Sequence, residues 1–196
     1  MNKLHVTLNG TMPLIMHSPK CVNPLHPLSK KMKELTSKRK KTEDDLEKLS
    51  DLEWESGCYW SNDIGLYIPG EAIAATLLAA AKLNKNGSAI QKYVQIVDAI
   101  VPLDIGEKQD YEKLKVDPRF RDVRTVCVQR SRVVRTRPRF NTWRCGFDLI
   151  YDEAKIDADT IILALENAGQ YIGLLEMRTL GYGRFASAVD EVEMVA

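Results

Sequence analysis

Alternating apolar and polar positions near the start of the chain predict a strand that is buried on one face. In KLHVTL, residues 3–8, Leu4, Val6 and Leu8 share one face, with the period of two that is typical of a β-strand. A second strand is expected over residues 143–151 (WRCGFDLIY). A last strand should begin near Arg184, after a glycine turn.

Two further segments have the composition of core helices. The phrase YIPGEAIAATLLAAAK predicts a turn at Gly70 followed by a helix over residues 71–82, whose alanines permit close packing on a sheet. Residues 157–170 predict a second helix, with Asp157 or Asp159 as its N-cap. These two helices and the strands around them are the expected core.

The order of these elements predicts the fold class. Residues 90–103 have the composition of strand and residues 104–120 that of a charged loop, so the order is strand, helix, strands, strand, helix, strand. This order indicates an α+β protein with a ferredoxin-like βαββαβ core. We expect residues 1–196 to form a single domain that carries insertions.

Residues 19–56 differ abruptly in composition from this core. Three prolines predict a loop, and residues 29–54 then have high helical propensity and a dense charge that is basic in the first half and acidic in the second. Thr42 followed by three acidic residues is a favourable helix start. We expect an inserted pair of helices, or one helix broken near Thr42, which is either a solvated hairpin or a second phosphate-binding patch.

The segment from Arg119 to Arg144 concentrates positive charge. It holds nine arginines and one acid, Asp122, in a chain with 28 basic and 27 acidic side chains. Its valines favour strands, and a tight turn near Arg130 and Ser131 would make it a hairpin. Arginine fits phosphate oxygens two at a time, so the pattern is typical of a nucleic-acid surface; the alternative is an edge strand whose arginines pair with acids from elsewhere.

Composition sets limits on the remaining possibilities. Hydrophobic content of 44% and charged content of 28% are ordinary for a globular domain. No apolar run approaches the ~20 residues that span a bilayer, and we expect a cytoplasmic protein without membrane contact. The four cysteines form no CxxC pair, and no nucleotide-cofactor motif is present. We therefore expect reduced thiols, no metal and no cofactor.

Two phrases resemble those of a known family. IPGEAIAATLLAAAK at residues 68–82 resembles the segment that opens the first helix in RAMP-superfamily proteins, and LGYGRF at residues 180–185 resembles their glycine-rich loop. These are ferredoxin-like subunits, similar in core to RRM domains, of CRISPR effector and RNA-processing complexes. Here Ala74 and Ala75 stand where that helix usually carries a basic residue. The whole chain also resembles uncharacterised phage and prophage proteins.

The resemblance and the arginine cluster together predict a non-enzymatic protein that binds single-stranded RNA or DNA and could assemble along the strand as a homo-oligomer or within a larger ribonucleoprotein. Aromatic side chains beside the arginines could stack on unpaired bases. The expected contacts are Arg130, Arg132, Arg135, Arg137, Arg139, Trp143, Arg144, Arg178 and Arg184, with a secondary basic patch of Lys30, Lys31, Lys38, Arg39, Lys40 and Lys41, and with Gly70, Gly181 and Gly183 shaping loops.

Two other functions compete with this prediction. The near-neutral net charge and the dipolar helical segment suit a phage assembly or anti-defence module that binds protein. A metal-independent ribonuclease, which the family resemblance also allows, would use His5, His17 or His26 as general acid or base. Asp98, Asp148 and Asp152 are candidate metal-binding carboxylates, although no motif links them.

Overall fold

The computed structural model describes residues 1–128 and 130–192, which form two compact units. Unit 1 comprises residues 1–14, 60–108 and 141 onward, and unit 2 comprises residues 15–59 and 109–140. Each unit therefore combines segments that are far apart in the sequence. The expectation that the chain forms a single domain stays a prediction.

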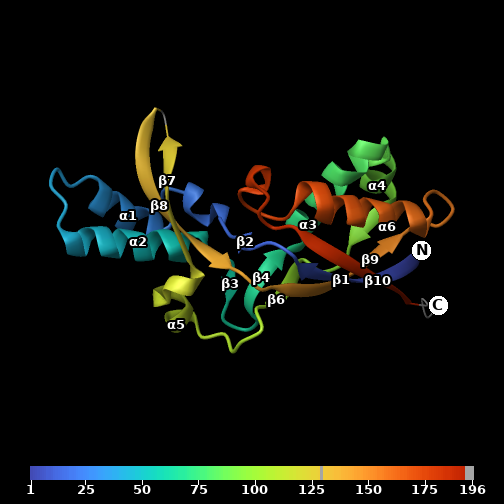
Figure 1. Ribbon diagram of the computed structural model, residues 1–196, viewed down its shortest axis with the longest axis horizontal. Coiled ribbons are helices and arrows are strands. Elements are labelled where there is room, and N and C mark those ends of the chain that lie inside the picture. Colours follow the sequence, from blue (N-terminus) through green and yellow to red (C-terminus); the bar gives the residue numbers. More distant parts are fainter. Residues whose placement is uncertain (129, 193–196) are drawn as a thin grey trace. The chain divides into compact units, whose positions relative to one another are not determined.

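Unit 1 is built on an antiparallel sheet with the strand order β10-β1-β9-β6-β4-β3, and β5 also pairs with β9 (Figure 1). The bounds of its strands are β1 Asn2–Gly10, β3 Trp60–Ser61, β4 Gly65–Pro69, β5 Val94–Ile96, β6 Ile100–Asp104, β9 Arg144–Tyr151 and β10 Phe185–Val192. Its helices are α3 Gly70–Ala81, α4 Gly87–Tyr93 and α6 Ala158–Asn167.

The central strands have the ferredoxin-like arrangement. β1 pairs antiparallel with both β9 and β10, and β6 pairs antiparallel with β9. The helix α3 lies between β1 and β6 in the sequence, and α6 lies between β9 and β10. Read as βαββαβ, the four strands therefore lie in the order 4-1-3-2, which confirms the predicted α+β, ferredoxin-like fold.

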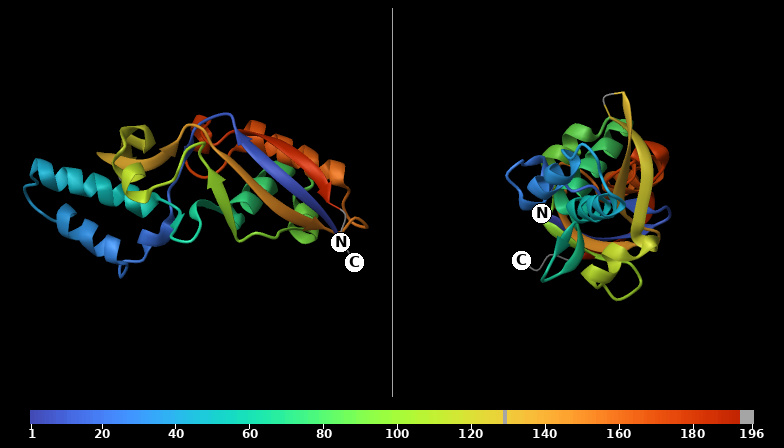
Figure 2. Two further views of the ribbon diagram at one scale, coloured as in Figure 1. Left: turned by 90° about the horizontal axis from the view of Figure 1, so that it is seen from below. Right: turned by 90° about the vertical axis from the view of Figure 1, so that its left-hand side faces the viewer.

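Helices cover one face of this sheet, and the other face, called here the open face, carries partly exposed polar residues of β1 such as Lys3 and His5. Leu4, Val6 and Leu8 of β1 are fully buried, as their alternation predicts, together with Phe147 of β9. The helices α3 and α6 pack against each other on that side (Figure 1). Figure 2 shows the long strands β1, β9 and β10 side by side. The polar residues of β1 consequently lie on the open face.

Close backbone contact explains the two glycine phrases. A side chain at Gly70 would place its Cβ 2.0 Å from the carbonyl oxygen of Asp98, and the Gly70 N–H donates to the Ala99 carbonyl. Gly183 has a φ of +68°, and a Cβ there would lie 2.2 Å from the Leu174 carbonyl oxygen. Both glycines thus let a helix or loop approach a neighbouring strand or turn, while Gly181 serves the turn itself with a φ of +86°.

Unit 2 combines a helical pair with the arginine-rich hairpin. Its elements are α1 Pro27–Thr36, α2 Glu43–Gly57, α5 Tyr111–Val116, β7 Arg121–Val128 and β8 Ser131–Phe140, and β8 also pairs with the short strand β2 Leu14–Ile15 in a three-stranded sheet. Thr42 caps α2 as expected and forms a capping box with Asp45. The helix α2 packs along β8 and α1 packs against α2.

Trp54 is the centre of the unit 2 core. Its ring on α2 is fully buried, and its indole N–H donates to the Phe120 carbonyl over 2.8 Å. Tyr111 contacts the ring edge to face, and burial raises the pKa of the Tyr111 hydroxyl. The centroid of the Phe140 ring lies 5.8 Å from that of Phe120. Residues from both chain segments of the unit therefore meet at one indole.

Two of the predicted spans differ from the structure. Residues 90–103 begin in helix α4, and only β5 and β6 within that span are strands. Residues 104–120 contain α5 and a short 3-10 helix, Pro118–Phe120, rather than loop alone. In α5 and in that 3-10 turn an aspartate caps the first N–H groups, Asp110 and Asp117 respectively, so short capped turns replace the expected charged loop.

Candidate nucleic-acid interface

The arginine-rich segment forms the predicted hairpin. β7 and β8 pair in antiparallel register from Arg121 opposite Pro138 to Val128 opposite Ser131. Arg130 lies in the connecting turn with a φ of +68°. Residues that face each other in this register share a face of the hairpin, so Arg135 and Arg137 lie on the face of Asp122 and Arg124.

Several of the arginines form ion pairs within unit 2. Arg121 donates to Asp51 (2.8 Å) and Ser50 (2.7 Å) on α2, and Arg135 pairs with Glu53 of the same helix. Glu53 also accepts the Thr136 N–H over 2.8 Å. The acidic half of the charged helical segment therefore neutralises part of the hairpin, as the alternative interpretation of the arginines expects.

Local aspartates hold two more arginines. Arg124 forms two hydrogen bonds with Asp122, whose side chain is only 5% exposed. Arg119 binds Asp117 through both Nε and Nη2, and these bonds lower the pKa of the Asp117 carboxyl. Because these guanidinium groups are engaged with carboxylates, they are less available for phosphate.

The arginines nearest the turn are placed differently. Arg130 and Arg132 are exposed, and within residues 1–128 and 130–192 no hydrogen bond or ion pair holds either side chain. Arg137 and Arg139 are half-buried nearer the base of β8. The tip of the hairpin thus presents two uncompensated charges to solvent.

The aromatic residues beside these arginines point into the core, which corrects the prediction of stacking platforms. Trp143 is 2% exposed and donates its indole N–H to the Met12 carbonyl over 2.9 Å. Its ring meets Phe185, which is also buried, edge to face. Phe140 is fully buried. Phe140, the last residue of β8, and Trp143, in the turn before β9, are both turned inward, while Arg144 next to Trp143 is exposed.

The remaining predicted arginines belong to unit 1. Arg144 and Arg178 are exposed, and Arg184 is half-buried. The Nη1 atom of Arg184 is buried and has no hydrogen-bond partner in the described part of the chain. The structure thus places the predicted contacts in two groups, with Arg130–Arg139 in unit 2 and these three in unit 1.

The secondary basic patch is mainly a solvated helix and loop. Lys30 and Lys31 are exposed on α1, and Arg39 and Lys40 are exposed in the connection to α2. Lys38 forms an ion pair of 2.6 Å with Asp45 and thereby lowers the pKa of that carboxyl. Lys41 donates to the Lys38 carbonyl. Part of this charge therefore stabilises the start of α2.

The candidate histidines have three different environments. His26 accepts the Leu28 N–H at its Nδ1 atom and caps α1, so this nitrogen is committed to the helix. His17 lines a pocket of unit 2. His5 lies on the open face of the unit 1 sheet, where its Nδ1 meets Asp148 over 2.7 Å. The contacts given for His5 and His26 are with Asp148 and with the start of α1, not with another histidine.

Two of the three candidate metal-binding carboxylates, Asp98 and Asp148, form a hydrogen-bonded cluster with Lys3 and His5, whereas Asp152 accepts the Ala154 N–H. Asp148 accepts from Lys3 as well as His5, and its backbone N–H donates to Asp98 over 2.8 Å. Among the described residues, no group of three or more histidine, cysteine or acidic side chains could hold a metal ion. The bonds from Lys3 and then His5 lower the pKa of the Asp148 carboxyl.

This cluster predicts a pH-dependent contribution to stability. Because the pKa of Asp148 is lower in the folded protein than in the unfolded chain (~3.9), its stabilisation is present above that value and is lost as the pH falls through the folded pKa. We expect Asp148→Asn to reduce the free energy of unfolding by about 1 kcal/mol at neutral pH, and the difference to vanish in acid. Urea unfolding of both proteins between pH 7 and pH 2 measures this difference in the free energy of unfolding.

Asp63→Asn is the control for this measurement, since Asp63 is exposed in the turn between β3 and β4. That variant should match the parent protein at every pH. A loss in Asp148→Asn that persists unchanged at pH 2 would contradict the assigned ion pairs.

The comparisons with known proteins give a structural likeness alone. The sequence matches no protein-family model, and none of the curated proteins is a significant match. Among solved structures, a chain in the cryo-EM structure of the type III-B Cmr-beta bound to cognate target RNA is similar with a TM-score of 0.47 and 11% sequence identity. The likeness covers 98% of this chain and 61% of that one.

A bilayer-spanning helix is not found either: none of the helices in the described ranges has the length and apolar character to cross a membrane.

Proposed function

We propose that the protein binds single-stranded nucleic acid through the β7–β8 hairpin, as a RAMP-like and non-enzymatic protein. The observation that carries the proposal is the exposure of Arg130 and Arg132 at the hairpin tip without an ion-pair partner in the described chain. Guanidinium groups placed in this way can each take two phosphate oxygens without breaking an existing ion pair.

The contacts of the hairpin arginines support different tasks for them. Arg121 is held by Asp51 and ties the hairpin to α2, whereas Arg124 is held by Asp122 within β7 itself. Arg135 pairs with Glu53 but has further donor groups, because a guanidinium carries five N–H groups. We assign the phosphate contacts first to Arg130 and Arg132, and then to Arg135, Arg137 and Arg139.

The buried aromatic rings determine what kind of recognition is expected. With Phe140 and Trp143 in the core, the hairpin offers charge but no ring for base stacking. Phosphate contacts position a strand and carry no sequence information. Binding through this surface should therefore be nearly independent of base sequence.

The ferredoxin-like strand order and the two glycine phrases support a RAMP-like protein. We further propose that copies assemble along a bound strand, as backbone subunits of that superfamily do. Arg144, Arg178 and Arg184 of unit 1 would then provide additional phosphate contacts.

Fluorescence anisotropy with labelled single-stranded RNA, single-stranded DNA and duplex DNA tests the proposal. The logarithm of the binding constant should fall linearly with the logarithm of salt concentration, with a slope of about −0.7 per phosphate contact for single strands. The five hairpin arginines alone predict a slope of about −3.5, and contacts from the unit 1 arginines would make it steeper. An absence of binding at low salt, or binding that salt does not weaken, would exclude this function.

A second candidate is a protein-binding surface on the same hairpin. Val123 and Val134 are 58% and 60% exposed on the face opposite Asp122, and several arginines are already neutralised. A protein partner would use this apolar strip. Purification free of nucleic acid, with no binding in the anisotropy assay, would favour this candidate.

A further inference from the structure

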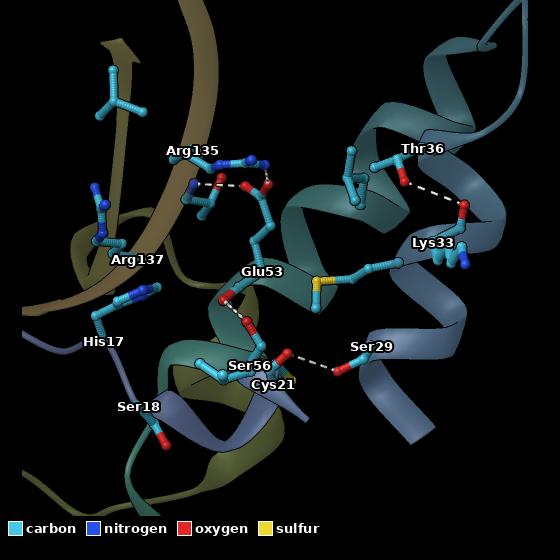
Figure 3. A pocket seen from close by; sticks show the side chains of 15 residues that line it. His17, Ser18, Cys21, Ser29, Lys33, Thr36, Glu53, Ser56, Arg135 and Arg137 are labelled. Atoms are coloured by element: carbon cyan, nitrogen blue, oxygen red, sulfur yellow. Dashed lines mark hydrogen bonds and ion pairs between the residues drawn. The ribbon is translucent and has the colours of Figure 1, made fainter. Parts of the chain in front are cut away.

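A pocket in unit 2 has the features of a ligand site, and it is separate from the tip of the hairpin. Its walls come from η1 (Pro19–Val22) and the residues just before it, from α1, from α2 and from the hairpin, and it has a volume of about 550 Å³ (Figure 3). Volumes of ~300–1,000 Å³ are typical of small-molecule sites. The sequence gives no sign of it, because four separate segments form it.

One side of the pocket is cationic. Arg135 and Arg137 of β8 lie on the same side as His17, opposite α1 (Figure 3). Glu53 is the one carboxylate of the lining, and it is engaged with Arg135 and the Thr136 N–H. Lys33 adds a third cation from the facing side, on α1. Cationic groups therefore exceed acidic ones, which favours an anionic ligand.

Hydroxyl groups on α1 and α2 also line the pocket, and their oxygens can act as acceptors. Ser29 donates its hydroxyl proton to the Cys21 carbonyl, Thr36 donates to Lys33, and Ser56 donates to Glu53 (Figure 3). Because each proton is already used, the oxygen lone pairs remain for donors on a ligand. Sugar hydroxyls and base N–H groups are such donors.

Apolar side chains complete the lining. Met32 from α1, Leu49 from α2 and Val126 from β7 contribute the apolar surface. Methionine adapts to flat and irregular ligands, so a planar base can lie against this part of the wall. Phosphate-binding cations, hydroxyl acceptors and an apolar wall thus occur together in one pocket.

We propose that this pocket binds a single nucleotide, with its phosphate at Arg135 and Arg137 and its nucleoside against the hydroxyl and apolar wall. The nucleotide is either free in solution or an unpaired residue of a bound strand. The strand as a source rests on the function proposed above, whereas the free nucleotide does not.

Isothermal titration calorimetry of the protein (residues 1–196) with UMP and AMP tests the proposal, with uridine and inorganic phosphate as partial ligands. We expect saturable binding of the monophosphates, and at least tenfold weaker binding of uridine and of inorganic phosphate. Equal affinity for inorganic phosphate and UMP would overturn the proposal, since the nucleoside would then contribute nothing. Failure of UMP and AMP to bind would also overturn it.

Two substitutions are expected to change the affinity for UMP in opposite directions. A folding defect would weaken binding in both, so the pair separates a direct effect on the pocket from misfolding. Lys33→Glu, at an exposed position, should weaken UMP binding on the order of tenfold through charge reversal. Glu53→Gln retains a hydrogen-bond acceptor and removes the opposing charge, so it should strengthen binding by several-fold. Lys113→Glu is the matched control, because Lys113 is 86% exposed and lies outside the pocket. The same change in all three variants would overturn the proposal.

Competition between UMP and a single-stranded oligonucleotide shows whether the nucleotide is free or belongs to a bound strand. If a single-stranded oligonucleotide displaces UMP, the pocket takes a residue of the strand. If UMP binds equally well in its presence and to the variant with Arg130 and Arg132 changed to alanine, the ligand is a free nucleotide. The anisotropy of that variant tests the proposed function separately, so the two proposals can fail independently.

Discussion

Replacing Arg130 and Arg132 together with alanine is expected to weaken binding of a single-stranded oligonucleotide on the order of 25-fold at 0.1 M salt. Each phosphate contact with a single strand makes the binding constant vary with the salt concentration to the power of about −0.7. At 0.1 M salt, one contact therefore contributes roughly fivefold in affinity relative to 1 M salt. The salt slope should become shallower by about 1.4 for the same reason. Both side chains are exposed and lack partners in the described chain, so their loss should leave the fold intact.

The matched control removes two positive charges from the same unit at paired positions. Lys113 and Arg119 are 86% and 63% exposed and form ion pairs with Asp110 and Asp117. The double variant Lys113→Ala/Arg119→Ala should lose far less affinity, because those charges are partly compensated. If both double variants lose the same affinity, net charge alone governs binding and the hairpin tip has no special role.

Trp54→Ala should destabilise unit 2 by about 3–5 kcal/mol, which is the usual cost of truncating a buried aromatic side chain. The ring is fully buried, and its removal also leaves the Phe120 carbonyl without its donor. Trp54→Phe keeps most of the volume and loses the hydrogen bond, so a cost of ~1–3 kcal/mol is expected. Urea unfolding measures the change in the free energy of unfolding for each variant. Hydrogen exchange followed by mass spectrometry shows which part of the chain is destabilised.

Hydrogen exchange should accelerate in peptides from residues 15–59 and 109–140, which form unit 2. Trp60→Ala is the control, since Trp60 is half-exposed in unit 1 and its indole N–H donates to the exposed Asn62 side chain. An equal cost in Trp60→Ala, or faster exchange confined to unit 1, would contradict the central place assigned to Trp54.

The elements that the sequence predicts best are those with a strong local cause. The alternation of Leu4, Val6 and Leu8 marks β1, and Thr42 with its acidic neighbours marks the start of α2. The turn at Arg130 between two valine-rich runs marks the hairpin. Each signal lies within a few residues, so it can be recognised before any long-range contact is known.

The features that the sequence does not predict depend on long-range packing. Trp143 lies beside an arginine in the sequence, but its N–H reaches Met12, 131 residues away, and the ring enters the core. The partners of Arg121 and Arg135 on α2 are also distant in the sequence. The pocket lined by His17, Lys33 and Arg137 joins segments that show no common motif. Only the folded chain brings such groups together.

The strand order of unit 1 has a consequence for synthesis on the ribosome. β1 is made first, yet both of its neighbours, β9 and β10, lie beyond residue 143. Unit 2 has all of its residues once Phe140 has been made. A nascent chain of that length carries β1 with its edges unpaired, a state that favours aggregation. The helical pair and the hairpin of unit 2 can thus be fully synthesised before β9 and β10, the strands that pair with β1, have been made.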